Sequence, residues 1–222
     1  MKLAIYGGSF NPIHFGHLAV ADEALCMGYD KVLLVPTFIP PHKQLTASVS
    51  PSSRLAMLEA AIKGNPGLVV EPCELQRGGI SYTIDTVRFL IKKYKDDREG
   101  KFGLIMGQEI AAEFEKWKSP EEIASLCDII IAARHNLGGN VDSAVANKPR
   151  GQYIGGMDAK GQFLDVNKSA FKWPYVELKN PVIPISSTEI RSRIEGGKSW
   201  RYLLPEPVYE YIVANRLYGY KQ

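Results

Sequence analysis

Two histidines three residues apart, His14 and His17, are the first residues in the chain whose types and spacing suggest chemistry. In the first turns of a helix both rings would point the same way, because residues three apart are neighbours on a helix surface. Gly7 and Gly8 precede them, and glycine lets backbone N–H groups approach an anion without interference from a Cβ atom. Gly16, between the histidines, leaves room for a ligand. Together these residues suit the binding of phosphate groups.

A strand, a loop and a helix must position these residues. The apolar run 3–6 has the length of a strand, a Gly-Gly turn and a short polar loop follow it, and an amphipathic helix begins close to Phe15. A helix start offers free N–H groups and the positive end of the helix dipole, which favour an anion. Surface histidines or zinc ligands are the alternatives. A zinc site needs three or four ligands, and neither cysteine nor carboxylate lies nearby in sequence.

The composition is that of a globular chain. It has 222 residues, of which 45% are hydrophobic, and a net charge of +3 at pH 7 with no basic stripe, so we expect a buried core and no nucleic acid as a partner. We predict a single domain over 1–222, with an insertion at 136–172, where glycine is frequent and periodicity is weak. Whether the chain forms a homo-oligomer is left open.

The cysteines and the hydropathy pattern predict a cytoplasmic protein. Cys26, Cys73 and Cys127 are spread singly, which is typical of reduced thiols. The chain enters a short strand directly at its N-terminus, so we expect no signal peptide. No apolar run approaches the roughly 20 residues that cross a membrane, so no membrane is expected as a partner.

Alternating strands and helices predict an α/β fold. Further apolar strands are expected at 31–36, 68–71, 102–106, 127–133 and 175–178, and helices at 15–27, 51–63, from 84, from 119, from 188 and around 203–212. This pattern favours a Rossmann-like, doubly wound parallel sheet with C-terminal helices. Ligands bind beyond the carboxyl ends of such strands, and residues 7–17 would lie at such an end.

Several polar residues are expected at helix starts. Ser50, followed by proline, has the pattern of an N-cap. Ser81 or Thr83 would cap the helix that begins near residue 84, and Ser119, with a glutamate three residues later, predicts a capping box. Arg54 is expected to be a surface or structural residue.

Two stretches of the chain resemble the nucleotidylyltransferase superfamily. The first matches its GxFxPxHxGH signature, as Gly8-Ser9-Phe10-Asn11-Pro12-Ile13-His14-Phe15-Gly16-His17. The second matches its ISSTxxR box, as Ile185-Ser186-Ser187-Thr188-Glu189-Ile190-Arg191. The chain is most similar to the bacterial nicotinate-mononucleotide adenylyltransferases, because Ser81-Tyr82-Thr83, Trp117 and the terminal helix also match. The resemblance covers nearly the whole chain apart from the insertion.

The resemblance implies adenylyl transfer from ATP to nicotinate mononucleotide, giving deamido-NAD and pyrophosphate in NAD biosynthesis. His14 and His17 would hold the ATP phosphates and stabilise the transition state. Arg191 and Lys43 would offset the developing charge, although Lys43 could also be a solvated loop lysine. Magnesium is expected on the phosphate oxygens, with no metal site made by the protein alone.

The implied binding residues form two sets. For ATP they are Gly7, Gly8, Ser9, Phe10, His14, His17, Gly107, Glu109, Ile185, Ser186, Ser187, Thr188 and Arg191. For the mononucleotide they are Lys43, Ser81, Thr83, Met106, Trp117, Lys118 and Arg134. A lone tryptophan such as Trp117 is commonly a core residue, and hydroxyls such as those of Ser81 and Thr83 commonly cap helices.

The chain departs from the family pattern at two positions. Glu109 stands where the family commonly has aspartate, and Lys118 stands where an aromatic residue is often found, so part of the ring pocket is expected to be built differently. Two other functions compete with the first. One is an adenylyltransferase of the same fold that uses nicotinamide mononucleotide or phosphopantetheine, and the other is a non-catalytic nucleotide sensor.

Overall fold

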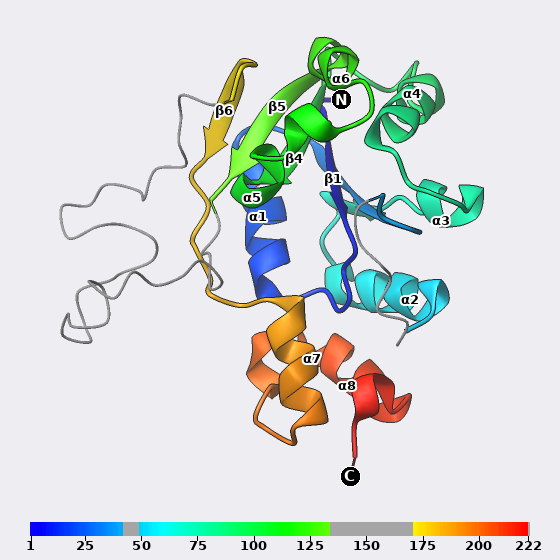
Figure 1. Cartoon of the computed structure of the whole chain (residues 1–222), viewed down its shortest axis with the longest axis vertical. Coiled ribbons are helices and arrows are strands. Elements are labelled where there is room, and N and C mark those ends of the chain that lie inside the picture. Colours follow the sequence, from blue (N-terminus) through cyan, green and yellow to red (C-terminus); the bar gives the residue numbers. More distant parts are fainter. Residues whose placement is uncertain (42–48, 134–170, 222) are drawn as a thin grey trace, which may run out of the picture.

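The protein is built around one six-stranded sheet. The computed structural model describes residues 1–41, 49–133 and 171–221, and Figure 1 shows helices packed around a twisted sheet. The strand order is β3-β2-β1-β4-β5-β6, and every neighbouring pair is parallel. The strands are β1 (Leu3–Gly8), β2 (Lys31–Pro36), β3 (Leu68–Val70), β4 (Phe102–Gly107), β5 (Cys127–Ala132) and β6 (Tyr175–Leu178). The predicted doubly wound α/β fold is confirmed.

The winding reverses between β1 and β4, which lie side by side in the middle of the sheet. Ile5 of β1 is in register with Leu104 of β4, although the two strands are separated by β2 and β3 in sequence. At such a point, the loops that follow the two neighbouring strands run to opposite faces of the sheet. A crevice therefore opens between them at the carboxyl edge of the sheet. The loop after Gly8 and the turn after Gly107 therefore begin at this crevice.

The helices match most of the predicted ones. They are α1 (Phe15–Cys26), α2 (Pro51–Ile62), α3 (Cys73–Arg77), α4 (Thr83–Lys93), α5 (Gln108–Ala111), α6 (Pro120–Leu126), α7 (Ser187–Glu195) and α8 (Glu206–Ala214), with short 3-10 turns η1 (Phe114–Lys116), η2 (Arg201–Leu203) and η3 (Leu217–Gly219). In Figure 1, α7 and α8 lie together beyond the end of the sheet, near α2. The contact between α2 and α8 joins the first third of the chain to its last residues.

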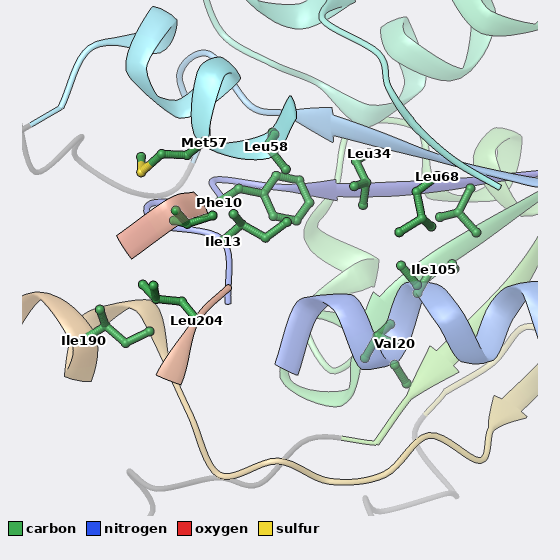
Figure 2. Packing of buried hydrophobic residues seen from close by; sticks show 14 of the residues in the cluster. Phe10, Ile13, Val20, Leu34, Met57, Leu58, Leu68, Ile105, Ile190 and Leu204 are labelled. Atoms are coloured by element: carbon green, nitrogen blue, oxygen red, sulfur yellow. The ribbon is translucent and has the colours of Figure 1, made fainter. Parts of the chain in front are cut away.

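The sheet separates two hydrophobic clusters, because successive side chains of a strand point to opposite faces. The first cluster contains Ala4, Leu34 and Ile105 with residues of α1, α2, α7 and α8, and Figure 2 shows part of it. The second contains Leu3 and Ile5 with residues of α3, α4, α5 and α6. Each face of the sheet is thus covered by its own set of helices.

The predicted helix caps are partly confirmed. The hydroxyl of Ser50 accepts a hydrogen bond from the N–H of Ser53 at 3.1 Å, as expected. The predictions for Ser81 and Thr83 are wrong, since Tyr82 is the N-cap of α4 and makes no side-chain cap bond. The hydroxyl of Ser81 instead accepts from the N–H of Phe38 at 3.1 Å. That contact ties the start of α4 to the loop that follows β2.

The predicted capping box at Ser119 is also wrong. Its backbone has φ 55°, in the left-handed region, and its side chain makes no cap bond. A capping box needs an extended backbone at the N-cap, so the left-handed conformation turns the hydroxyl away from the N–H groups that it was expected to bind. Most of the predicted insertion, residues 136–170, lies outside the described residues.

Across residues 1–41, 49–133 and 171–221, no helix combines the length and the apolar character that crossing a membrane requires. The three cysteines are free thiols. Cys26 is exposed, whereas burial raises the pKa of Cys73 and of Cys127 to about 12.

Candidate active site

The two histidines lie together at the start of α1. His14 is the N-cap, with an extended backbone and a ring that is only 2% exposed. The ring of His17 stacks on it, with 3.8 Å between the ring centroids and 30° between the planes. The predicted common orientation of the two rings is confirmed.

A backbone hydrogen bond sets the tautomer of His17. The N–H of His14 donates to Nδ1 of His17 at 3.3 Å. A ring nitrogen that accepts a hydrogen bond carries no proton, so the neutral imidazole holds its proton on Nε2. His17 can therefore act as a hydrogen-bond donor through Nε2, which is the role that a phosphate oxygen requires.

The three glycines of this region serve different purposes. A Cβ atom added at Gly7 would meet no described heavy atom within 4 Å, so this position is open to an approaching ligand. A Cβ at Gly8 would lie 3.1 Å from the ring of Phe10, and one at Gly16 would lie 3.1 Å from the ring of His14. The space at Gly16 is thus taken by the His14 ring, which corrects the expectation that it is left for a ligand.

The buried side chain of Phe10 anchors the loop in the first hydrophobic cluster. Its backbone has φ 44° and its side chain is 1% exposed. The ring packs edge-on against Tyr6 and His17, at 5.7 Å and 5.1 Å between centroids. A non-glycine residue in the left-handed region costs roughly 1–3 kcal/mol and persists only where its surroundings hold it. Because the side chain of Phe10 is buried, this residue can face a nucleotide only with its backbone. The neighbouring Ser9 is exposed.

The two diagnostic boxes meet in space. One Nη of Arg191 donates to the carbonyl of Asn11 at 2.7 Å, and the other donates to Thr188 Oγ1 at 3.2 Å. The hydroxyl of Ser187 donates to the carbonyl of Pro12 at 2.8 Å. The loop after β1 and the start of α7 therefore form one structural unit, although about 180 residues separate them.

The start of α7 offers a second helix N-terminus at this place. Ser186 is its N-cap and accepts from the N–H of Glu189 at 3.1 Å. Ile185, Ser186 and Ser187 are half-buried, and Thr188 is exposed. Two helix N-termini with their N–H groups and dipoles thus flank the loop, which is an arrangement that favours a polyanion.

Two residues that the sequence did not single out as functional also hold the loop. Arg54 is only 3% exposed, and its Nη1 donates to the carbonyl of Ser9 at 2.8 Å. The hydroxyl of Tyr218 donates to Oδ1 of Asn11 at 2.6 Å, and its ring is 6% exposed. Arg54 is thus a structural residue, as expected. No sequence motif marks Tyr218, whose contact spans 207 positions.

Of the predicted mononucleotide residues, Met106 lies in β4, and Ser81 and Thr83 lie at the start of α4, while the predicted ATP residues Gly107 and Glu109 follow Met106. Met106 and Ser81 are buried, and Thr83 is the half-buried first residue of α4. Gly107 is the N-cap of α5, and Glu109 lies in the first turn of that helix. The side chain of Met106 belongs to the second hydrophobic cluster. It can therefore support a ring pocket from the core side only.

Lys118 faces the start of α4, and Trp117 precedes it in the chain. The indole of Trp117 is half-buried and packs against Phe114 at 5.2 Å between centroids. Nζ of Lys118 lies 3.3 Å from Oδ2 of Asp85 and 4.6 Å above the ring of Tyr82. Trp117 is thus partly a core residue, as its type suggested, while part of its side chain remains accessible.

Aromatic residues at the end of the predicted insertion and directly after it support this turn. Phe114 is fully buried and contacts Phe171 at 5.7 Å and Trp173 at 4.8 Å between centroids. Nζ of Lys172 lies 2.5 Å from Oε1 of Glu115 in the same turn. The turn that carries Trp117 is therefore packed against the segment leading into β6.

The remaining predicted site residues, Lys43 and Arg134, lie outside the described residues. Within the described ranges no group of three or more histidine, cysteine, aspartate or glutamate side chains could hold a metal ion. The loop and the start of α7 supply imidazole, hydroxyl and guanidinium groups, which bind phosphate, whereas Mg²⁺ prefers carboxylates. The carboxylate in the first turn of α7, that of Glu189, pairs with Arg193 at 2.9 Å. This donor set fits a metal ion that is carried by a nucleotide.

The comparisons with known proteins agree with this geometry. The family model described as Cytidylyltransferase-like matches residues 5–193. The chain belongs to this family of nucleotidyltransferases, so the resemblance found in the sequence is confirmed.

Within this family, the chain is similar to curated nicotinate-nucleotide adenylyltransferases. A probable nicotinate-nucleotide adenylyltransferase of Treponema pallidum (strain Nichols) is 40% identical over 222 residues, with 98% of this chain and 99% of the relative covered. Another of Citrifermentans bemidjiense is 38% identical, with 98% of each chain covered. The solved nicotinic acid mononucleotide adenylyltransferase of Plasmodium falciparum, complexed with NaAD, matches with a TM-score of 0.69 at 17% identity, over 99% of this chain and 98% of that one. At that identity the match supports the fold alone.

Proposed function

We propose that this protein transfers the adenylyl group of ATP to nicotinate mononucleotide, giving deamido-NAD and pyrophosphate in NAD biosynthesis. The observation that carries the proposal is the contact between the two boxes, in which Arg191 of α7 donates to the carbonyl of Asn11 in the histidine loop. This contact unites two imidazoles, one guanidinium and two helix N-termini around one place. The relatives that match over nearly the full length carry the name of this activity.

The reaction needs positioning and charge neutralisation more than a strong base. A phosphate oxygen of the mononucleotide attacks the α-phosphorus of ATP in line, and the bond from that phosphorus to the oxygen bridging to the β-phosphorus breaks. The attacking oxygen is already anionic, and the leaving group departs as pyrophosphate. Catalysis by such a site comes from orienting the reactants and stabilising the charge that develops.

The described residues suit these tasks. His14 and His17 hold the α- and β-phosphates, with His17 donating from Nε2 to a phosphate oxygen. Arg191 offsets the charge on the leaving pyrophosphate, and the N-terminus of α7 with Ser186, Ser187 and Thr188 binds the rest of the triphosphate. Lys43 is proposed for the same charge neutralisation on the strength of the family resemblance. Gly7 and Gly8 admit the nucleotide, with Gly107 and Glu109 on the other side of the crevice.

Magnesium is expected to bind together with ATP, as the MgATP complex. Mg²⁺ keeps several waters and is held by phosphate oxygens together with few protein groups. It supplies neutralisation of phosphate charge, while the imidazole and guanidinium groups of the protein orient the same phosphates.

The mononucleotide lies at the start of α4 in this proposal. Ser81 and Thr83 line the pocket, Trp117 stacks on the pyridine ring, and Lys118 supplies positive charge near the ring carboxylate. Met106 supports the pocket from the core, and Arg134 is the candidate for the phosphate or the carboxylate. A single domain and a cytoplasmic location remain predictions that accompany this function.

Pyrophosphate release from MgATP tests the proposal. Nicotinate mononucleotide, nicotinamide mononucleotide and phosphopantetheine are supplied in parallel, and an identical preparation of His17→Ala reports contaminating activity. We expect release mainly with nicotinate mononucleotide. Equal release of pyrophosphate with nicotinamide mononucleotide would show that the protein does not recognise the ring carboxylate. Release with phosphopantetheine alone would contradict the proposed acceptor.

A further inference from the structure

The loop of residues 9–12 is held by side chains from three distant parts of the chain. Arg54 of α2 binds the carbonyl of Ser9, and Arg191 of α7 binds the carbonyl of Asn11. Tyr218 of η3 binds the side-chain oxygen of Asn11. Three donors therefore converge on four residues that are separated from His14 only by Ile13.

The burial of two of these donors is unusual for their types. The guanidinium of Arg54 is 3% exposed, and burial lowers its pKa. The phenol of Tyr218 is 6% exposed, and burial raises its pKa, although the charges of Arg191 and Arg54 lower it. Burying a charge or a hydroxyl costs free energy unless a partner compensates it. In both cases the partner is the loop, so each donor and the loop depend on one another.

Hydrophobic packing ties the same elements to the loop. Figure 2 shows Phe10 and Ile13 with Leu58 and Met57 of α2 nearby, and Ile190 of α7 on the other side. All five belong to the first hydrophobic cluster, together with Tyr218. The loop is thus fixed both by its apolar side chains and by its oxygens, and any shift would strain the two sets together.

We propose that Arg54 and Tyr218 are positioning residues of the adenylyl transfer. They touch neither reactant but hold the loop of residues 9–12, and through it the imidazoles of His14 and His17 and the guanidinium of Arg191. Tyr218 lies beyond residues 5–193, the part that the family model matches, so the C-terminal segment is in this way part of the active centre. A displacement of about 1 Å at a reacting group can lower the rate by about 10²-fold. This inference rests on the proposed function.

The decisive variant is Tyr218→Phe, which removes one hydroxyl and keeps the buried ring. Tyr220→Phe is its matched control, since the ring of Tyr220 packs on Trp200 at 6.1 Å between centroids. We expect kcat to fall by about tenfold in Tyr218→Phe while KM for nicotinate mononucleotide stays unchanged. Arg54→Lys keeps a donor of one charge and should retain more activity than Arg54→Met.

Two readouts separate positioning from loss of folding. The melting temperature and circular dichroism report the fold, and the NMR signals of the His14 and His17 imidazoles report the loop directly. We expect these imidazole signals to shift in Tyr218→Phe, and not in Tyr220→Phe, with the fold retained. Unchanged imidazole signals together with wild-type kcat in Tyr218→Phe would overturn the proposal.

The same readouts keep the two proposals apart. If the wild-type protein released no pyrophosphate with nicotinate mononucleotide, the proposed function would fail. The imidazole shifts and the Kd for MgATP would still test whether Tyr218 positions the loop, because neither requires turnover. A weaker Kd and shifted imidazoles would then support the positioning role, and unchanged values would overturn it.

Discussion

The two parts of the proposed site are built in opposite ways. Around His14 and His17, the protein buries its polar contacts and draws them from α2, α7 and η3. Around Trp117 and Lys118 the polar contacts are more exposed: the Lys118–Asp85 pair lies at the surface, with 49% of the lysine side chain and 34% of the aspartate side chain exposed. The first region is rigid because several of its contacts hold one loop, so a change in one disturbs the others. In the second region, an exposed pair such as Lys118–Asp85 can change with less effect on its neighbours.

This difference fits the chemistry that each region is proposed to perform. The phosphates of ATP and the in-line geometry of transfer are the same whatever the acceptor, so the residues that hold them tolerate little change. The ring of the acceptor differs between related reactions. A region made of exposed contacts can be altered more easily, and position 118, where lysine stands in place of a common aromatic residue, lies in this region.

The largest effect is expected at the rigid region. His17→Ala should lower kcat by about 10²-fold or more, because it removes a donor that stabilises the transition state. Steady-state pyrophosphate release measures it, and Asp22→Asn on the exposed face of the same helix is the control. A rate close to that of the wild type would refute the role of His17.

At the second region, Trp117→Ala should act on binding instead of chemistry. We expect KM for nicotinate mononucleotide to rise by about tenfold with little change in kcat, since aromatic stacking contributes about 0.5–1.5 kcal/mol. Trp117→Phe should keep part of this binding. A loss in kcat as large as that of His17→Ala would show that the two regions do not differ as described.

The buried phenol of Tyr218, in the rigid region, should affect how the free energy of unfolding changes at alkaline pH. The pKa of Tyr218 is raised by burial, so its stabilising contribution is fully present below about pH 10, the ordinary phenol pKa, and is lost as pH rises through the raised value. Tyr218→Phe should therefore show a shallower alkaline fall in the free energy of unfolding, by at most about 1.4 kcal/mol per pH unit. Urea titrations from pH 8 to 11 measure it, with Tyr220→Phe expected to follow the wild type.

The smallest effect is expected for Lys118→Met. Removing an exposed ammonium should lower the preference for nicotinate over nicotinamide mononucleotide by about threefold, and salt should weaken the difference, because exposed charges are screened. Lys116→Met is the matched control, since that ammonium pairs with Glu113 in the same turn. An unchanged ratio of kcat/KM values for the two acceptors would remove Lys118 from acceptor selection.

Local patterns predicted the fold and the first part of the site. The apolar runs set the strands, and the spacing of His14 and His17 sets their common orientation, because both depend on neighbours within a few residues. Caps were less predictable: Ser50 behaves as expected, whereas Ser81 binds Phe38 from another loop and Ser119 adopts a left-handed backbone. At Ser81 a hydrogen bond with another loop outweighed the local preference, and at Ser119 a left-handed backbone did so.

Contacts between distant parts of the chain could not be predicted in the same way. Nothing near Tyr218 in sequence indicates that its hydroxyl reaches Asn11. Arg54 was expected to be a surface or structural residue, and its sequence context does not identify Ser9 as its partner. The role of Gly16 was misjudged because the ring that fills its space folds back from His14. These features depend on tertiary packing, which periodicity and spacing do not encode.

The contact between Tyr218 and Asn11 also has a consequence for the order of folding. It closes a loop of 207 positions, and the entropy of closing long loops delays the contacts that close them. The parallel sheet can assemble from earlier segments, but the histidine loop reaches its final geometry only when the last helix and η3 have docked. In a refolding experiment, catalytic activity should therefore return after the sheet has formed.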